Sequence, residues 1–342
     1  HQIWTRAALF ALPVLVSQVA VTQLQSDMGY APLASASAQE KKQPDTRETR
    51  RTPALRNKVY EKLAEAQAAA EANDLATASK ILDGMIASGG KKALNSYELA
   101  NVSNLYAFIH YSREDYGKAL QAYEQVVSQP DIPLAMEINT RYTIAQLYFV
   151  QEDWQKGINA LLKWFDMTET PNAGAYVLLA QGYYQTKDYD KALLNVEKAI
   201  SMHNEKQAAK PAAERKPPKE QWYNLARFLY FEKGDINKTV DILEILLNYY
   251  PKKDYWVQLS HMYGEQKKEA LQLAAMDTAY VQNMLDKGTE QVTMAYLYLN
   301  GEVPYRAGKV MEKGLKDGSI QATSKNYEIA ASAWRQAQEL DK

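Results

Sequence analysis

The sequence has no cysteine and only four histidines among its 342 residues. The absence of cysteine excludes disulfide bonds, a thiol nucleophile and a lipid anchor attached to cysteine. None of the histidines has a second histidine or an acidic residue at a spacing that stands out as a metal site. His110 falls on a core position of an expected helix, where a hydrogen-bonded structural histidine is expected. We therefore predict no metal and no other cofactor.

The chain also has almost no net charge, and it lacks the common catalytic motifs. Forty basic residues are matched by 41 acidic ones, a formal net charge of −1, so no basic surface for nucleic acid is indicated. There is no glycine-rich phosphate loop, no H-E-x-x-H motif and no G-x-S-x-G motif. Alternating strand patterns are absent too, while apolar residues make up 46% of the chain, a globular balance. These features predict an all-α protein that is not an enzyme.

What recurs instead is a pair of small residues about a dozen positions apart, found seven times. Two antiparallel helices approach to about 8–10 Å only where the residues at their contact are small. Each pair therefore predicts the crossing point of a helical hairpin, although the sixth pair is two residues short and its turn is expected to be irregular. The pairs are Ala66/Ala78, Ala107/Ala119, Ala145/Gly157, Ala180/Ala192, Ala226/Thr239, Ser260/Ala270 and Ala295/Gly308.

The segment from Ala175 to Ile200 shows the pattern in most detail. Two apolar stripes with i, i+3, i+4, i+7 spacing predict amphipathic helices, and Lys187 and Asp188 predict the turn between them. This segment resembles the tetratricopeptide repeat, whose period is about 34 residues. The resemblance implies a right-handed α-solenoid of about seven such hairpins with a C-terminal capping helix, spanning residues 54–342. Within it, residues 204–219 contain Pro211, Pro217 and Pro218, which predict a disordered insert without helix.

The first 53 residues have a different character. Arg6 precedes an apolar run from Ala7 to Val16 that fades out by Val21, shorter than the span of about 20 residues that a membrane requires. Residues 1–38 are therefore predicted to be a secretory signal peptide, cut after Ala38, with a short uncleaved membrane anchor as the alternative. Residues 39–53 are polar and charged, which favours a flexible linker.

In tetratricopeptide repeats, the concave wall is formed by residues three before, one after and four after the small residue of each first helix. The resemblance thus implies a protein-binding groove rich in aromatic and amide side chains and one arginine, typical of interface hot spots. An extended or helical segment with apolar anchors is the expected ligand, and packing between repeats is the alternative interpretation of each tyrosine. The predicted groove residues are Asn104, Phe108, Tyr111, Tyr142, Gln146, Phe149, Gln181, Tyr184, Tyr223, Arg227, Tyr230 and His261.

A narrower resemblance rests on three segments, Thr52 to Gln67, Asn95 to Tyr111 and Tyr255 to Glu265. They are similar to a periplasmic repeat protein of Gram-negative bacteria that is commonly encoded beside TonB, ExbB and ExbD. This implies a non-catalytic adaptor or accessory factor for that machine, which drives the uptake of iron complexes. The implied location is the periplasm, or the inner membrane facing the periplasm if the N-terminal segment stays uncleaved. The implied partners are proteins, possibly TonB, ExbB or ExbD, with membrane contact only through that segment.

Two other functions fit the same residues. One is a scaffold for another envelope process, such as polysaccharide export or outer-membrane assembly. The other is a carbohydrate-binding or enzymatic solenoid that uses the tyrosine-lined wall.

Overall fold

The computed structural model describes residues 54–339, and all the regular secondary structure in this range is helical. The predictions of a signal peptide or anchor at residues 1–38, and of a linker at 39–53, lie outside the described residues. None of the described helices is both long and apolar enough to cross a membrane.

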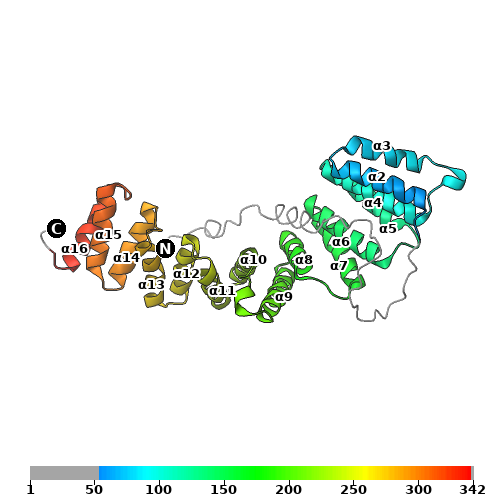
Figure 1. Ribbon diagram of the computed structural model, residues 1–342. Helices are drawn as coiled ribbons and strands as arrows, with labels where there is room; N and C mark the ends of the chain where they lie inside the picture. The colour runs from blue at the N-terminus through cyan, green and yellow to red at the C-terminus, as the bar shows by residue number, and fades with distance from the viewer. Residues whose placement is uncertain (1–53, 340–342) are drawn as a thin grey trace. The chain divides into compact units, whose positions relative to one another are not determined.

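Fifteen α-helices are described, and fourteen of them form seven antiparallel hairpins (Figure 1). The prediction of an all-α chain of about seven tetratricopeptide-like hairpins with a C-terminal capping helix is confirmed. The hairpins are α2 (Asn57–Glu71) with α3 (Leu75–Ile86), α4 (Ser96–Ser112) with α5 (Tyr116–Ser128), α6 (Leu134–Val150) with α7 (Trp154–Met167), α8 (Ala173–Gln185) with α9 (Tyr189–Ala208), α10 (Glu220–Glu232) with α11 (Ile236–Tyr249), α12 (Lys253–Glu265) with α13 (Glu269–Val281), and α14 (Gly288–Asn300) with α15 (Pro304–Asp317). Helix α16 (Ser324–Gln336) packs on α15 as the cap. Two short 3₁₀ turns, Gly90–Lys92 and Ala212–Glu214, lie in the connections.

The described chain divides within α9 into an N-terminal unit, residues 54–195, and a C-terminal unit, residues 196–339. In the N-terminal unit, three of the apolar clusters follow one another, and each joins a hairpin to the first helix of the next. A smaller cluster of Ala100, Val126 and Ile132 lies between α4, α5 and the connection to α6. In the C-terminal unit, one larger cluster runs from α13 to α16. A core of this kind is built between neighbours along the chain, as in a repeat protein.

Every hairpin turn is built in the same way. Three residues separate the two helices, and the middle one has a positive φ between 57° and 74°. In five hairpins the third residue is an aspartate whose carboxylate accepts a hydrogen bond from the backbone N–H three residues on, which caps the second helix. The turn predicted at Lys187 and Asp188 is one of these and is confirmed. The last two turns have Lys268 and Val303 at the capping position.

Because the turns are uniform, the crossing residues stand at fixed counts from the capping residue: eight before it and four after it. The sixth turn is therefore regular, and the expected Ser260/Ala270 pair is wrong. Ala270 is exposed, and Ser260 instead faces Gln272, whose backbone carbonyl accepts a 2.8 Å hydrogen bond from the Ser260 hydroxyl. In the α10/α11 hairpin the same count places Arg227, rather than Ala226, at the crossing. In the α14/α15 hairpin it places the buried Ala307, rather than Gly308, opposite Ala295.

The insert predicted at residues 204–219 is partly helical. Helix α9 continues to Ala208, so the prediction that helix is excluded from this segment is wrong for its first five residues. The prolines act only further on, from Pro211 to Pro218. The segment also makes defined contacts: the Lys216 N–H donates to the Gln207 side chain at 2.9 Å, and the Pro218 carbonyl accepts from the Tyr250 hydroxyl at 2.8 Å.

Consecutive hairpins are joined by tyrosine–carboxylate pairs. In each, a tyrosine of a first helix donates to a carboxylate on the preceding second helix. Four of the tyrosines stand five residues before the capping residue, and Tyr183 occupies the same place in α8, opposite Leu162 instead of an acid. Burial and the neighbouring carboxylate raise the pKa of Tyr263 and of Tyr298 to about 12, so both phenols remain donors at neutral pH. The pairs are Tyr106–Asp83, Tyr148–Glu124 at 3.0 Å, Tyr230–Glu197, Tyr263–Glu244 at 2.5 Å and Tyr298–Asp277.

Removing one of these hydroxyls should weaken the stack. We expect Tyr263→Phe to lower the free energy of unfolding by about 1 kcal/mol, because a hydrogen bond to a charged acceptor is lost without loss of ring packing. Tyr183→Phe is the matched control, since no acid faces that hydroxyl, and it should cost less than about 0.5 kcal/mol. Urea denaturation followed by circular dichroism measures both. Equal losses in the two variants would contradict this role for the pair.

A buried carboxylate ties the first two hairpins together. Glu98 is fully buried and accepts hydrogen bonds from the Arg56 side chain, through Nε at 2.8 Å and Nη2 at 2.5 Å. It also accepts the backbone N–H of Arg56, the residue before α2, and that of Asn95, the residue before α4. The hydrogen bond from Arg56 is the main cause that lowers the pKa of Glu98 below its usual value.

This lowered pKa gives stability a defined pH dependence. The folded state favours the ionised carboxylate, so its contribution is complete above the usual glutamate pKa of about 4.3 and is lost as the pH falls below that value. We expect Glu98→Gln to be destabilising at pH 7 and the difference from the wild type to shrink steadily below about pH 4. Thermal melts across the pH range measure it, and a difference that is independent of pH would overturn the assignment.

Candidate functional site

The structure divides the twelve predicted groove residues into two groups. Seven are partly exposed: Asn104, Phe108, Tyr111, Gln181, Tyr184, Tyr230 and His261. Five are buried: Tyr142, Gln146, Phe149, Tyr223 and Arg227. A buried side chain has no surface to offer a partner, so these five positions need a structural account.

On α6 the predicted residues belong to the core. The Tyr142 ring lies 4.7 Å from that of Trp164, and Phe149 is only 2% exposed. A Cβ atom added to Gly157 or to Gly182 would come within 2.8 Å of the Phe149 ring. The phenylalanine therefore fills the space that the two glycines leave at the junction of α6, α7 and α8. Tyr142 packs within its own hairpin, against Trp164 of α7.

On α10 the predicted groove residues Tyr223, Arg227 and Tyr230 were counted from Ala226, which is one position before the crossing residue of this hairpin. Arg227 is the crossing residue of this hairpin, and its guanidinium lies 5.5 Å from the centre of the Tyr255 ring. Burial lowers the pKa of Arg227 to about 10, which still leaves it charged at neutral pH. Tyr223 is buried as well, and its hydroxyl accepts a 2.9 Å hydrogen bond from the Asn204 side chain. Counting back from the turn at Gly234 would have revealed the displacement.

The corrected count defines an inner face of the C-terminal unit, made by three successive first helices. It is apolar and aromatic, with one histidine whose pKa is lowered by burial, so that the imidazole is neutral at pH 7. Tyr296 is its most accessible aromatic residue, with 41% of its surface exposed, and the other members are partly exposed. The members of this inner face are Asn224, Phe228 and Phe231 on α10, Val257, His261 and Gly264 on α12, and Val292, Tyr296 and Leu299 on α14.

In the N-terminal unit the corresponding aromatics serve the hairpins themselves. Tyr111 packs on Tyr116 with ring centres 5.5 Å apart, and Tyr184 stacks on Tyr189 at 6.0 Å. In both pairs the partner is the first residue of the second helix. These rings pack beside the turns of their own hairpins, which leaves them less free to serve a ligand.

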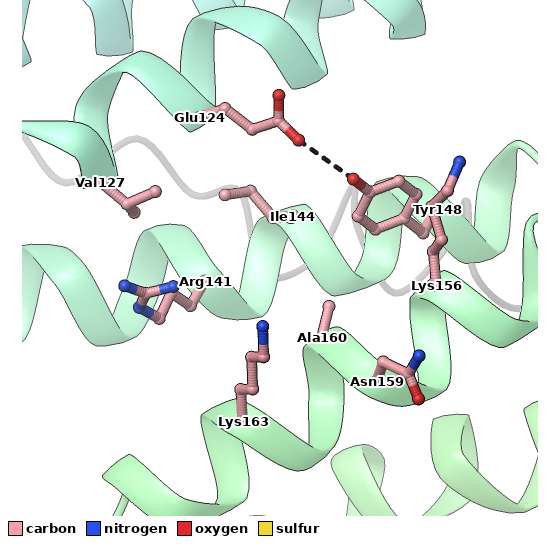
Figure 2. A pocket seen from close by; sticks show the side chains of 9 residues that line it. All are labelled: Glu124, Val127, Arg141, Ile144, Tyr148, Lys156, Asn159, Ala160 and Lys163. Carbon is pink, nitrogen blue, oxygen red and sulfur yellow. Dashed lines mark hydrogen bonds between the residues drawn. The ribbon is translucent and has the colours of Figure 1, made fainter.

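A pocket that the sequence did not predict lies in the N-terminal unit, between α5, α6 and α7. Figure 2 shows it, with basic groups around an apolar floor. Its volume is about 260 Å³. In sequence, the only signal is the basic residues Arg141, Lys156 and Lys163 within a single hairpin. The lining residues are Glu124, Val127, Arg141, Ile144, Tyr148, Lys156, Asn159, Ala160 and Lys163.

Across residues 54–339, no group of three or more histidine, aspartate or glutamate residues is arranged to hold a metal ion. Most of the perturbed carboxylate pKa values belong to capping aspartates and ion pairs, and several tyrosine pKa values are raised in the tyrosine–carboxylate pairs, whereas Arg227 and His261 are shifted mainly by burial.

The buried aromatics and the inner face should respond differently to truncation. We expect Phe149→Ala to cost about 3–5 kcal/mol of unfolding free energy, because it opens a cavity beside Gly157 and Gly182. Tyr296→Ala, on the inner face, should cost less than about 1 kcal/mol. Chemical denaturation of both variants measures the difference. An unchanged free energy of unfolding in Phe149→Ala would contradict the core position of this ring and would favour its prediction as a surface anchor.

No family profile and no curated protein sequence matches this chain. Solved structures with a similar arrangement of helices are tetratricopeptide repeat proteins. One, from Parabacteroides merdae, is 16% identical, and the match covers 81% of this chain and 99% of that one with a TM-score of 0.43. Another, YrrB, described as having an unusual peptide-binding site, is 13% identical over 54% of this chain and 84% of its own, with a TM-score of 0.41.

A third similar structure is that of Naa15/Naa10 bound to HypK. It is 14% identical and has a TM-score of 0.46, and the match covers 72% of this chain but only 35% of the matched chain. At these identities the likeness is one of fold alone.

Proposed function

We propose that this chain is a non-catalytic protein-interaction scaffold and that the inner face of its C-terminal unit is the main docking surface. The observation that supports this is the row of partly exposed apolar and aromatic side chains on α10, α12 and α14. Three helices present them at the same position relative to their turns, so they line up across successive hairpins. Apolar anchors of this kind suit a peptide segment that buries side chains at regular intervals.

The proposed setting is the bacterial envelope. Residues 7–21 have the composition of an export signal, and the resemblance of three segments to a repeat protein encoded with TonB, ExbB and ExbD supports a periplasmic adaptor of that machine. The proposed partners are accordingly the periplasmic parts of TonB, ExbB or ExbD.

The test is a quantitative binding measurement with the full chain and purified periplasmic domains of TonB, ExbB and ExbD. Tyr296→Ala, on the inner face, should weaken binding by about 2 kcal/mol if this ring is a hot spot. Tyr249→Ala is the matched control, because Tyr249 is 54% exposed on the second helix α11 and should leave binding unchanged. Mass spectrometry of the protein from cells should find a chain that begins at Gln39.

The outcomes separate the parts of the proposal. Equal binding by both variants would exclude the inner face. Failure of all three domains to bind, while other envelope proteins bind through Tyr296, would reject the TonB assignment and keep the scaffold. A chain found uncleaved in the cytoplasm would reject the periplasmic setting.

A further inference from the structure

The pocket of Figure 2 presents basic groups to solvent above an apolar floor. Arg141 extends from α6, Lys156 and Lys163 come from α7, and the Lys163 side chain points into the space beside Arg141 (Figure 2). The floor is formed by Val127, Ile144 and Ala160, one from each of the three helices. The single lining acid is Glu124, and its carboxylate already accepts the hydrogen bond of Tyr148 at 3.0 Å.

The cations differ in how they are held. Arg141 is bound to Glu137, one turn earlier on α6, at 2.9 and 2.7 Å, and Lys156 to the capping carboxylate of Asp153 at 2.7 Å. The Lys163 ammonium group makes no hydrogen bond or ion pair with any residue in the described range. Glu137 and Asp153 do not line the pocket, so three cations and one engaged carboxylate face a ligand there.

Arg141 differs in type from the residues at the same position on the next three first helices. Twelve residues before the capping residue, where α6 has Arg141, the next three first helices have Tyr176, Tyr223 and Trp256. In α8 that aromatic packs across to the preceding second helix, with the Tyr176 ring 4.8 Å from Phe165. Arg141 instead folds back along its own helix to Glu137, and the volume between α5 and α7 remains open.

We propose that this pocket is a second binding site, which takes a carboxylate side chain of an acidic protein segment together with an adjacent aliphatic side chain. Lys163 and the Asn159 amide supply donors for the carboxylate, and Val127, Ile144 and Ala160 receive the aliphatic group. A volume of about 260 Å³ suits one or two side chains and is smaller than the roughly 300–1,000 Å³ of cofactor and drug sites. Two of its three walls are second helices, whereas the inner face of the C-terminal unit is made by first helices alone.

The test uses a fluorescein-labelled hexapeptide of alternating leucine and glutamate, with the full chain, in an anisotropy titration. We expect Lys163→Glu to weaken binding by at least about tenfold, because it places a like charge against the ligand carboxylate. Lys163→Met, which keeps the aliphatic stem, should weaken binding by a smaller factor, and Lys163→Arg should retain it. Lys198→Glu is the matched control, since Lys198 holds the same position in α9 and should leave binding unchanged.

Three further results decide the proposal. A peptide of alternating leucine and lysine should not bind, and added salt should weaken the glutamate peptide, as expected for a partly exposed charge contact. Equal binding by the wild type and Lys163→Glu, or no binding of the glutamate peptide, would overturn the site. Binding of phosphatidylglycerol vesicles that depends on Lys163, without peptide binding, would replace the peptide with a lipid headgroup and overturn the proposal as stated.

Discussion

The close crossing of two helices at a fixed count from a three-residue turn is the constraint on which the rest of this structure depends. The positive-φ residue and the capping residue fix where the second helix begins, and the crossing residues follow eight positions before and four after the cap. Once that contact is set, the helical period determines which side of the first helix each other side chain faces. This is why a slip of one residue at α10 exchanges the buried Arg227 for the partly exposed Phe228.

The same count explains how one hairpin is attached to the next. In four of the five pairs, a tyrosine three residues after the crossing residue reaches the second helix of the preceding hairpin, where an acid stands five residues after its own crossing residue. The turn of each hairpin therefore determines where its partner in the pair lies. In these four pairs, the hydrogen bond forms only when both hairpins have their turns at the same position relative to these residues. At the junction of α7 with α8, Leu162 replaces the acid and an apolar contact takes over, with Phe149 filling the space beside Gly157 and Gly182.

Much of the fold could be predicted from the sequence, because small residues and the Lys187–Asp188 turn are local signals. The errors arose where a local signal was absent or misleading. At α12 and α13 the turn lacks aspartate, so the count was anchored on Ala270, which is small but exposed. At α10 an alanine stands beside the true crossing residue, and an arginine is not expected there because burying its charge is costly. Tyr255 compensates in part, by placing its ring face 5.5 Å from the guanidinium.

The candidate surfaces were harder to predict, for a different reason. Whether an aromatic on a first helix is a ligand anchor or packing depends on what the following second helix places opposite it. Tyr111 and Tyr184 meet Tyr116 and Tyr189, whereas Gly264 on α12 lies against Gln272 and offers no ring. The basic pocket depends on a side-chain direction: Arg141 turns toward Glu137, whereas the next three first helices have an aromatic residue at this position.

The inner face and the basic pocket therefore differ from the regular repeat in different ways. On the inner face of the C-terminal unit, the second helices leave the first-helix aromatics partly uncovered, which favours apolar anchors. At the pocket in the N-terminal unit, a charged residue replaces the ring that would have filled the junction, which favours an acidic group. A regular stack supplies stability at most of its junctions, and both of the proposed binding surfaces lie where the pattern of the repeat is interrupted.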